Sequence, residues 1–123
     1  MGEIETQSAI IELLTFLENQ GKLWFTRLNV IPPVTKIGTK LIFRKMPNGA
    51  KTGISDLLVF KEGKTFWIEV KNKKWIREKA PKTKSKESQE KFEQAVKSHS
   101  GGSYHIVRTL QEFAEVIGFK NGR

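Results

Sequence analysis

Two carboxylates and a lysine lie at the ends of two short apolar runs in the middle of the chain. Asp56 stands near the start of the first run, and Glu69 and Lys71 close the second. Because strand side chains alternate between two faces, Glu69 and Lys71 project together, with only Val70 between them. A hairpin that pairs the two runs in register brings Asp56 close to both.

Two carboxylates at adjacent strand ends can bind a divalent cation such as Mg²⁺, which prefers oxygen ligands and keeps waters that a phosphate can replace. The cation lowers the pKa of a bound water and neutralises charge that develops on phosphorus. A lysine beside it can position that water or stabilise the transition state. The simplest alternative is an ordinary hairpin whose charged end faces solvent. The basic composition of the chain and supporting residues elsewhere favour the metal site.

The composition indicates a globular domain with an acidic partner. At 123 residues, the chain is most simply one domain spanning 1–123. Its formal charge of +9 and isoelectric point near 9.9 favour nucleic acid over a membrane, because no segment is long and apolar enough to span one. The lack of cysteine excludes disulfides and thiolate metal sites and fits the cytoplasm. The polar, acidic N-terminus is unlike a signal peptide.

Hydrophobic periodicity predicts a small α/β domain with a central mixed sheet flanked by helices. The hairpin strands are expected over 54–60 and 65–70, joined by a polar link whose glycine suits a turn. Residues 34–39 are expected to form a surface loop. The other expected elements are a helix over 3–19, strands over 22–30 and 40–45, a helix over 88–98, a strand over 103–108, and a last helix capped by Thr109 and ending near Ile117.

The first helix carries a candidate third carboxylate. Glu3 lies on the same stripe as Leu14 and Leu17, which are expected to face the core. Glu3 either approaches the metal from the helix side or belongs to a frayed first turn, where the helix dipole favours an acid. In the later helix, Gln89 lies three residues before Phe92 and therefore shares its inward face.

The strongest charge run follows the candidate metal ligands directly. Residues 71–86 contain eight basic side chains and one acidic side chain. Such runs are usually solvated, but this position suits contact with a phosphate backbone, with Trp75 available to stack on a base or to wedge a junction. Arg27, on an earlier strand, suits either a phosphate or water. The candidate nucleic-acid-binding residues are Arg27, Lys73, Lys74, Trp75, Arg77, Lys82, Lys84 and Lys86.

With these residues in place, the chain resembles the PD-(D/E)xK nuclease superfamily and, within it, the small stand-alone viral or bacterial type of virus-type replication-repair nuclease (VRR-NUC). The resemblance covers nearly the whole chain. Two departures are Ser55, where a proline is frequent, and a lysine-rich segment that is longer than usual before the glutamine helix. The matching features are Glu3 and Gln7 on the first helix, Gly53-Ile54-Ser55-Asp56, Ile68-Glu69-Val70-Lys71, Gln89 with Phe92, Gly101-Gly102, and the strand from Tyr104 to Arg108.

The resemblance implies a restriction-endonuclease-like core and hydrolysis of a phosphodiester with Mg²⁺ or Mn²⁺ and no covalent enzyme intermediate. The implied site residues are Asp56, Glu69 and the backbone carbonyl of Val70 as metal ligands, Lys71 as the group that orients the attacking water, Glu3 as a further acid, and Gln89 as support from the helix.

Small members of this group look like enzymes that dimerise and cut branched DNA such as four-way (Holliday) junctions. By analogy we expect a homodimer, whose two-fold axis suits the near symmetry of a junction, acting as a structure-selective DNA endonuclease. The alternatives are a nuclease with another preference, such as a nicking enzyme, an exonuclease or an RNase, and a non-catalytic DNA-binding module. A binding module has no evident need for two carboxylates that face a polyanion.

Overall fold

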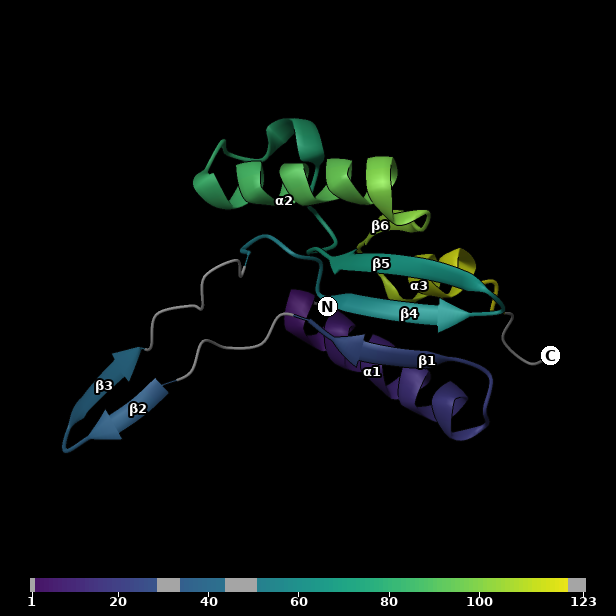
Figure 1. Ribbon diagram of the computed structural model, residues 1–123, viewed down its shortest axis with the longest axis horizontal. Coiled ribbons are helices and arrows are strands. Elements are labelled where there is room, and N and C mark those ends of the chain that lie inside the picture. Colours follow the sequence, from purple (N-terminus) through teal and green to yellow (C-terminus); the bar gives the residue numbers. More distant parts are fainter. Residues whose placement is uncertain (1, 29–33, 44–50, 120–123) are drawn as a thin grey trace.

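A computed structural model describes residues 2–28, 34–43 and 51–119 (Figure 1). The chain is mixed α/β, as the periodicity predicted. Its elements are α1 (Glu3–Asn19), β1 (Trp24–Arg27), β2 (Val34–Ile37), β3 (Lys40–Phe43), β4 (Leu57–Lys61), β5 (Lys64–Val70), the 3₁₀ turn η1 (Arg77–Lys79), α2 (Lys84–Ala95), the π-helical turn η2 (Val96–Ser100), β6 (Ser103–Val107) and α3 (Leu110–Val116).

The central sheet is mixed and has helices on both faces. Its four strands follow the order β1-β4-β5-β6, in which the first two pairings are antiparallel and β5 pairs parallel with β6. α1 and α3 lie against one face, and α2 lies over β5 and β6 on the other (Figure 1). β2 and β3 form a separate two-stranded antiparallel sheet.

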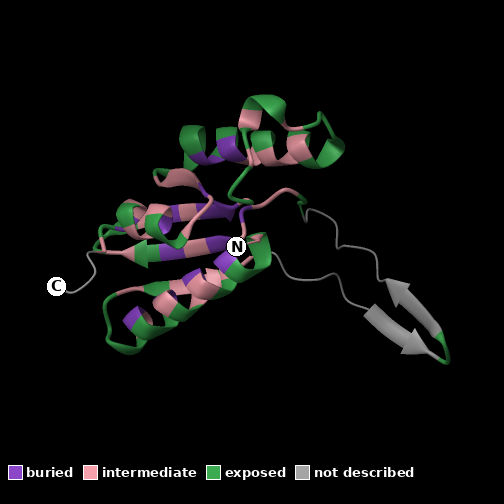
Figure 2. Cartoon of the chain, turned by 180° about the vertical axis from the view of Figure 1, so that it is seen from behind, coloured by how far each residue is buried: buried purple, intermediate pink, exposed green. Residues whose placement is uncertain are grey.

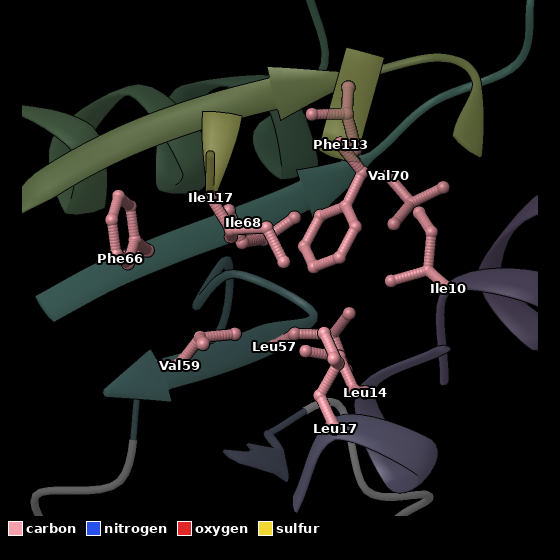
Figure 3. Close-up of a cluster of buried hydrophobic side chains, with 11 residues drawn as sticks. Ile10, Leu14, Leu17, Leu57, Val59, Phe66, Ile68, Val70, Phe113 and Ile117 are labelled. Carbon is pink, nitrogen blue, oxygen red and sulfur yellow. The ribbon is translucent and has the colours of Figure 1, made fainter. Parts of the chain in front are cut away.

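The core lies between the sheet and the α1/α3 layer, and Figure 3 shows its side chains converging from these elements. Alternate residues of the central strands supply one side of the core. The other side is the α1 stripe with Phe113 of α3 and Ile117, which directly follows that helix, so buried positions line the inner faces of the helices (Figure 2). The core residues are Ile10, Leu14, Leu17, Leu57, Val59, Phe66, Ile68, Val70, Val107, Phe113 and Ile117.

The β4–β5 hairpin closes through a tight turn. Glu62 and Gly63 both have positive φ, 53° and 76°, which is the requirement of a two-residue type I′ turn. The predicted link between the two runs is therefore confirmed. The first strand begins at Leu57 rather than at the predicted Ile54, because the segment before it packs against α2 instead of pairing along its length.

Two further sequence predictions are wrong. Residues 34–37 form a strand paired with β3, not a loop. The helix predicted to start at Ser88 starts at Lys84, because the Thr83 side chain accepts a hydrogen bond from the Lys86 N–H and caps it. The predicted parts of the chain that lie outside the described residues are 29–30 at the end of the first strand, the prolines 32–33, residues 44–45 and the turn at 47–49.

The helix over 3–19 and the Thr109 cap are confirmed; the Thr109 side chain accepts a hydrogen bond from the Glu112 N–H. In the ranges that the structure describes, no helix combines the length and apolar character needed to cross a membrane.

Gly53 should be irreplaceable for the placement of α2. It has φ +79°, and a Cβ there would lie 2.5 Å from the Ser88 carbonyl carbon and 2.7 Å from the Gln89 nitrogen. Gly21 has a similar φ of +73° with nothing within 4 Å, so it is the matched control. We expect Gly21→Ala to lower the free energy of unfolding by about 1 kcal/mol, the cost of a left-handed backbone. Gly53→Ala should lose a further 1–3 kcal/mol, roughly, through overpacking. Urea denaturation of both variants measures the difference, and equal losses would contradict this account.

Candidate functional site

Asp56 lies one residue before the last pair of the hairpin ladder, in which Leu57 pairs with Ile68. Asp56 is therefore close to Glu69, and its charge is among the causes that raise the Glu69 pKa. Asp56 is held from both sides: its backbone carbonyl accepts a hydrogen bond from the Leu28 N–H at 2.8 Å. Its Oδ2 accepts one from the Val70 N–H at 2.7 Å. The predicted approach of the two carboxylates at one end of the sheet is confirmed.

Glu69 is a buried acid in an acidic neighbourhood. It is 5% exposed, and burial, followed by the charge of Asp56, raises its pKa from 4.5 to about 7. Lys71 opposes this rise, and Glu3 adds to it from α1. Glu3 itself is exposed in the first turn of that helix, so the expected third acid lies close enough to influence the site electrostatically. Within the described part of the chain, the Glu69 Oε1 is buried without a hydrogen-bond partner.

Lys71 links the acids to α2. Its Nζ lies 3.5 Å from the Glu69 Oε2 and donates a 2.9 Å hydrogen bond to the Gln89 Oε1. The ammonium also lies 5.7 Å from the centre of the Trp75 ring. Gln89 therefore points inward, as the helical spacing predicted, and it fixes the lysine in place beside Glu69.

Trp75 is presented by a turn and braced by two arginines. Asn72 accepts hydrogen bonds from the Lys74 N–H through its side chain and from the Trp75 N–H through its carbonyl, at 2.8 and 2.9 Å. Arg77 lies over the ring at 5.9 Å, and Arg108 donates to the Trp75 carbonyl at 3.4 Å. The indole is thus oriented next to Lys71.

The arginine that braces Trp75 is anchored in turn by a buried acid on α2. The Glu93 carboxylate forms ion pairs with Arg77 at 3.0 Å and with Lys97 at 2.8 Å. Burial tends to raise the pKa of Glu93, but the hydrogen bonds from Lys97 and Arg77 outweigh it, and the net pKa is lowered. Glu93 is therefore an ionised structural partner of the basic segment.

The structure divides the predicted nucleic-acid-binding residues into two groups. Arg77 and Lys86 make internal contacts, since the Lys86 Nζ donates to the carbonyls of Arg77 and Ala80 at 3.2 and 3.3 Å. Arg27 is exposed but pairs with Leu57, so strand alternation sets it on the face away from Glu69. The predicted lysines that remain exposed are Lys73, Lys74, Lys82 and Lys84.

Sequence reasoning assigned no role to Tyr104 or Glu93. Tyr104 pairs with Trp67 and packs edge-on against Phe92, with the ring centres 6.2 Å apart. Burial, followed by the charge of Glu69, raises its pKa. Nothing local in the sequence indicates that β6 lies beside β5, so this neighbourhood is visible only in the fold.

Two carboxylates and a nearby carbonyl are a sufficient protein contribution for Mg²⁺, which often takes one or two carboxylates and fills its remaining positions with water. The buried, unpartnered Glu69 Oε1 suits a cation in the same way. In the described residues, no three His, Cys, Asp or Glu side chains gather closely enough to form a fuller ligand group.

Comparisons of the chain with protein-family models, with curated proteins and with solved structures find no match. The functional assignment therefore depends on the residues and geometry of this site.

The raised pKa of Glu69 predicts a stability that falls as pH rises. With a pKa of about 7 in the folded chain against 4.5 ordinarily, the folded state holds this proton more tightly than the unfolded state. The free energy of unfolding should fall by about 3 kcal/mol between these two pH values and then level off. Glu69→Gln should remove this fall and be more stable than wild type at pH 8, but not at pH 4.

Urea denaturation across this pH range measures the effect. Glu112→Gln is the control of opposite sign, because its hydrogen bond from Arg108 lowers the pKa of Glu112. Parallel pH profiles for wild type and Glu69→Gln would contradict the buried, protonated acid.

Proposed function

We propose that this protein is a metal-dependent, structure-selective DNA endonuclease with a restriction-endonuclease-like core of the VRR-NUC type. The observation that carries the proposal is the cluster in which Asp56 lies close to Glu69 while Gln89 holds Lys71 beside them. A hairpin end that were merely solvated would leave these groups exposed, whereas Glu69 is buried and Lys71 is largely covered.

Asp56, Glu69 and the carbonyl of Val70 would hold Mg²⁺ or Mn²⁺. When bound, the metal supplies a more acidic water and neutralises charge on the scissile phosphate. Loading requires Glu69 to lose the proton that its raised pKa retains near neutrality. Metal affinity should therefore increase as pH rises through about 7, where the carboxylate becomes available.

Lys71 is the group that orients the attacking water. Its ammonium is shared between the carboxylate of Glu69 and the amide of Gln89, so the side chain is fixed before substrate arrives. Water attacks phosphorus, one P–O bond breaks, and no covalent bond to the enzyme forms. Glu3 adds negative charge at the rim of the site and favours the cation.

The substrate we propose is branched DNA bound by a homodimer. The net charge of +9 suits a polyanion, and the exposed lysines of the segment after β5 flank the acids. Trp75 offers a ring beside the site for stacking at a branch point. Two copies related by a two-fold axis would present two such sites to a four-way junction. Light scattering tests the dimer, and a strict monomer would contradict symmetric junction cleavage.

Cleavage assays test the activity directly. Labelled four-way, flapped, single-stranded and linear duplex DNA are incubated with Mg²⁺, Mn²⁺ or EDTA. We expect cutting of the branched substrate that EDTA abolishes. Asp56→Ala and Lys71→Ala should lower the rate at least 10²-fold, the scale of a lost preorganised charge, while DNA binding is retained.

Exposed Glu78→Gln is the control and should cut like wild type. Undiminished cutting by Lys71→Ala would remove this site from the mechanism. Binding without cutting under every condition would favour the non-catalytic module, and a preference for linear ends or RNA would favour the other nucleases.

The lysine-rich segment should contribute to DNA binding through its exposed residues only. Lys82→Ala with Lys84→Ala should reduce the slope of log K against log salt by about 0.9 for each lost phosphate contact. The Lys86 ammonium donates hydrogen bonds to backbone carbonyls. We therefore expect Lys86→Ala to lower the free energy of unfolding and to leave the salt slope nearly unchanged. Fluorescence anisotropy at several salt concentrations measures both, and an unchanged slope in the double variant would exclude this segment from the DNA contact.

A further inference from the structure

A stacked aromatic pair lies on the uncovered half of the sheet. Trp24 and Phe60 are directly opposite each other in the antiparallel ladder, with ring centres 5.2 Å apart and planes 23° from parallel. They are 48% and 44% exposed. Single exposed apolar side chains are ordinary, but these two rings are stacked on each other and both remain nearly half exposed, so their outer faces and edges are open to further contacts.

This pair lies on the same face of the sheet as the acids. Along β4, Leu57 and Val59 enter the core, so Leu58 and Phe60 project from the other side. Leu58 pairs with Trp67, which packs against Phe92 of α2 with ring centres 5.3 Å apart. α2 covers only the β5 and β6 half of this face, and β1 and β4 lie away from it (Figure 1).

The surface leads toward the site. Phe60 follows Asp56 by four residues in the extended chain, a separation of roughly 13 Å. Stacked nucleotides advance about 3.4 Å each along a strand, so some four nucleotides would connect a phosphate at the acids with a base at the aromatic pair.

The charge of the chain identifies the occupant. Exposed Lys22 lies two residues before Trp24 in the chain, and the nearby acid Glu62 is paired with Lys61 at 2.9 Å. Unpaired nucleobases on a phosphate backbone supply both the flat π-faces and the negative charge that this surface suits.

We propose that Trp24 and Phe60 form a stacking platform for unpaired bases, which holds a single-stranded flank of the substrate on the open half of the sheet. The inference deepens the proposed nuclease and depends on it for the position of the flank. It explains how an enzyme could prefer DNA with an unpaired flank, such as flapped DNA, over fully paired DNA, because only unpaired bases expose the ring faces that the platform takes.

The test separates base contacts from phosphate contacts. Binding of an oligothymidylate is compared with that of an abasic oligonucleotide of equal length and charge, in EDTA, by fluorescence anisotropy. We expect Trp24→Ala and Phe60→Ala each to weaken oligothymidylate binding about ten-fold, the scale of one lost base stack. Binding to the abasic strand should not change. Trp24→Phe should restore most of the affinity.

Phe16→Ala is the matched control, because this ring on α1 is 56% exposed and lies on the helical layer at the opposite face of the sheet. It should bind both strands like wild type. Equal losses on the thymidylate and abasic strands would overturn the platform. So would a shift from dimer to monomer in Trp24→Ala by light scattering, which would assign the pair to an interface between copies. Because EDTA prevents metal-dependent cutting, the binding comparison does not depend on cleavage. The platform can therefore be tested even if the cleavage assay shows no activity.

Discussion

The desolvation of Glu69 is the constraint on which the rest of the site depends. Glu69 is 5% exposed, lies close to the carboxylate of Asp56 and has a buried Oε1 with no hydrogen-bond partner among the described residues. Such a carboxylate can be ionised only if positive charge is supplied nearby. The described residues supply one ammonium, that of Lys71, and divide it between Glu69 and Gln89. The pKa of about 7 is the compromise between these interactions. A divalent cation would favour the ionised form of Glu69, since the charge of the cation exceeds the charge that one shared lysine provides.

The helix α2 shares the burial of this acid with β6, whose Ile106 pairs with Glu69. That helix approaches the segment before β4 so closely at Gly53 that no side chain fits between them. The approach brings Gln89 to Lys71 and sets Phe92 on Trp67, which covers the strand on which Glu69 lies. Glu93, at the far end of the same helix, draws in Arg77 and with it the ring of Trp75. One helix thus holds Lys71 in position and, through Arg77, holds the ring of Trp75.

The sequence predicted the parts of this arrangement that depend on local periodicity. Strand alternation and a glycine turn were enough to bring Asp56, Glu69 and Lys71 together, and helical spacing was enough to turn Gln89 inward. The strand over 34–37 was missed because four residues between prolines and a glycine carry a weak strand signal without their partner. The start of α2 was misplaced because the lysine run masked the Thr83 cap. The depth of Glu69 and the neighbour Tyr104 depend on the parallel β5–β6 pairing, which local patterns do not encode.

The two faces of the sheet have different surroundings. The α1/α3 face is apolar and provides the core, so its residues are constrained by packing. The other face carries Glu69, Trp67 and the exposed Trp24 and Phe60, and only half of it lies under α2. Basic side chains flank this face, while the acids occupy one end of it. A polyanion attracted by the lysines would be repelled at that end unless a cation were bound there. The lysines therefore attract the substrate, and the acids make its approach to their end of the sheet depend on the metal.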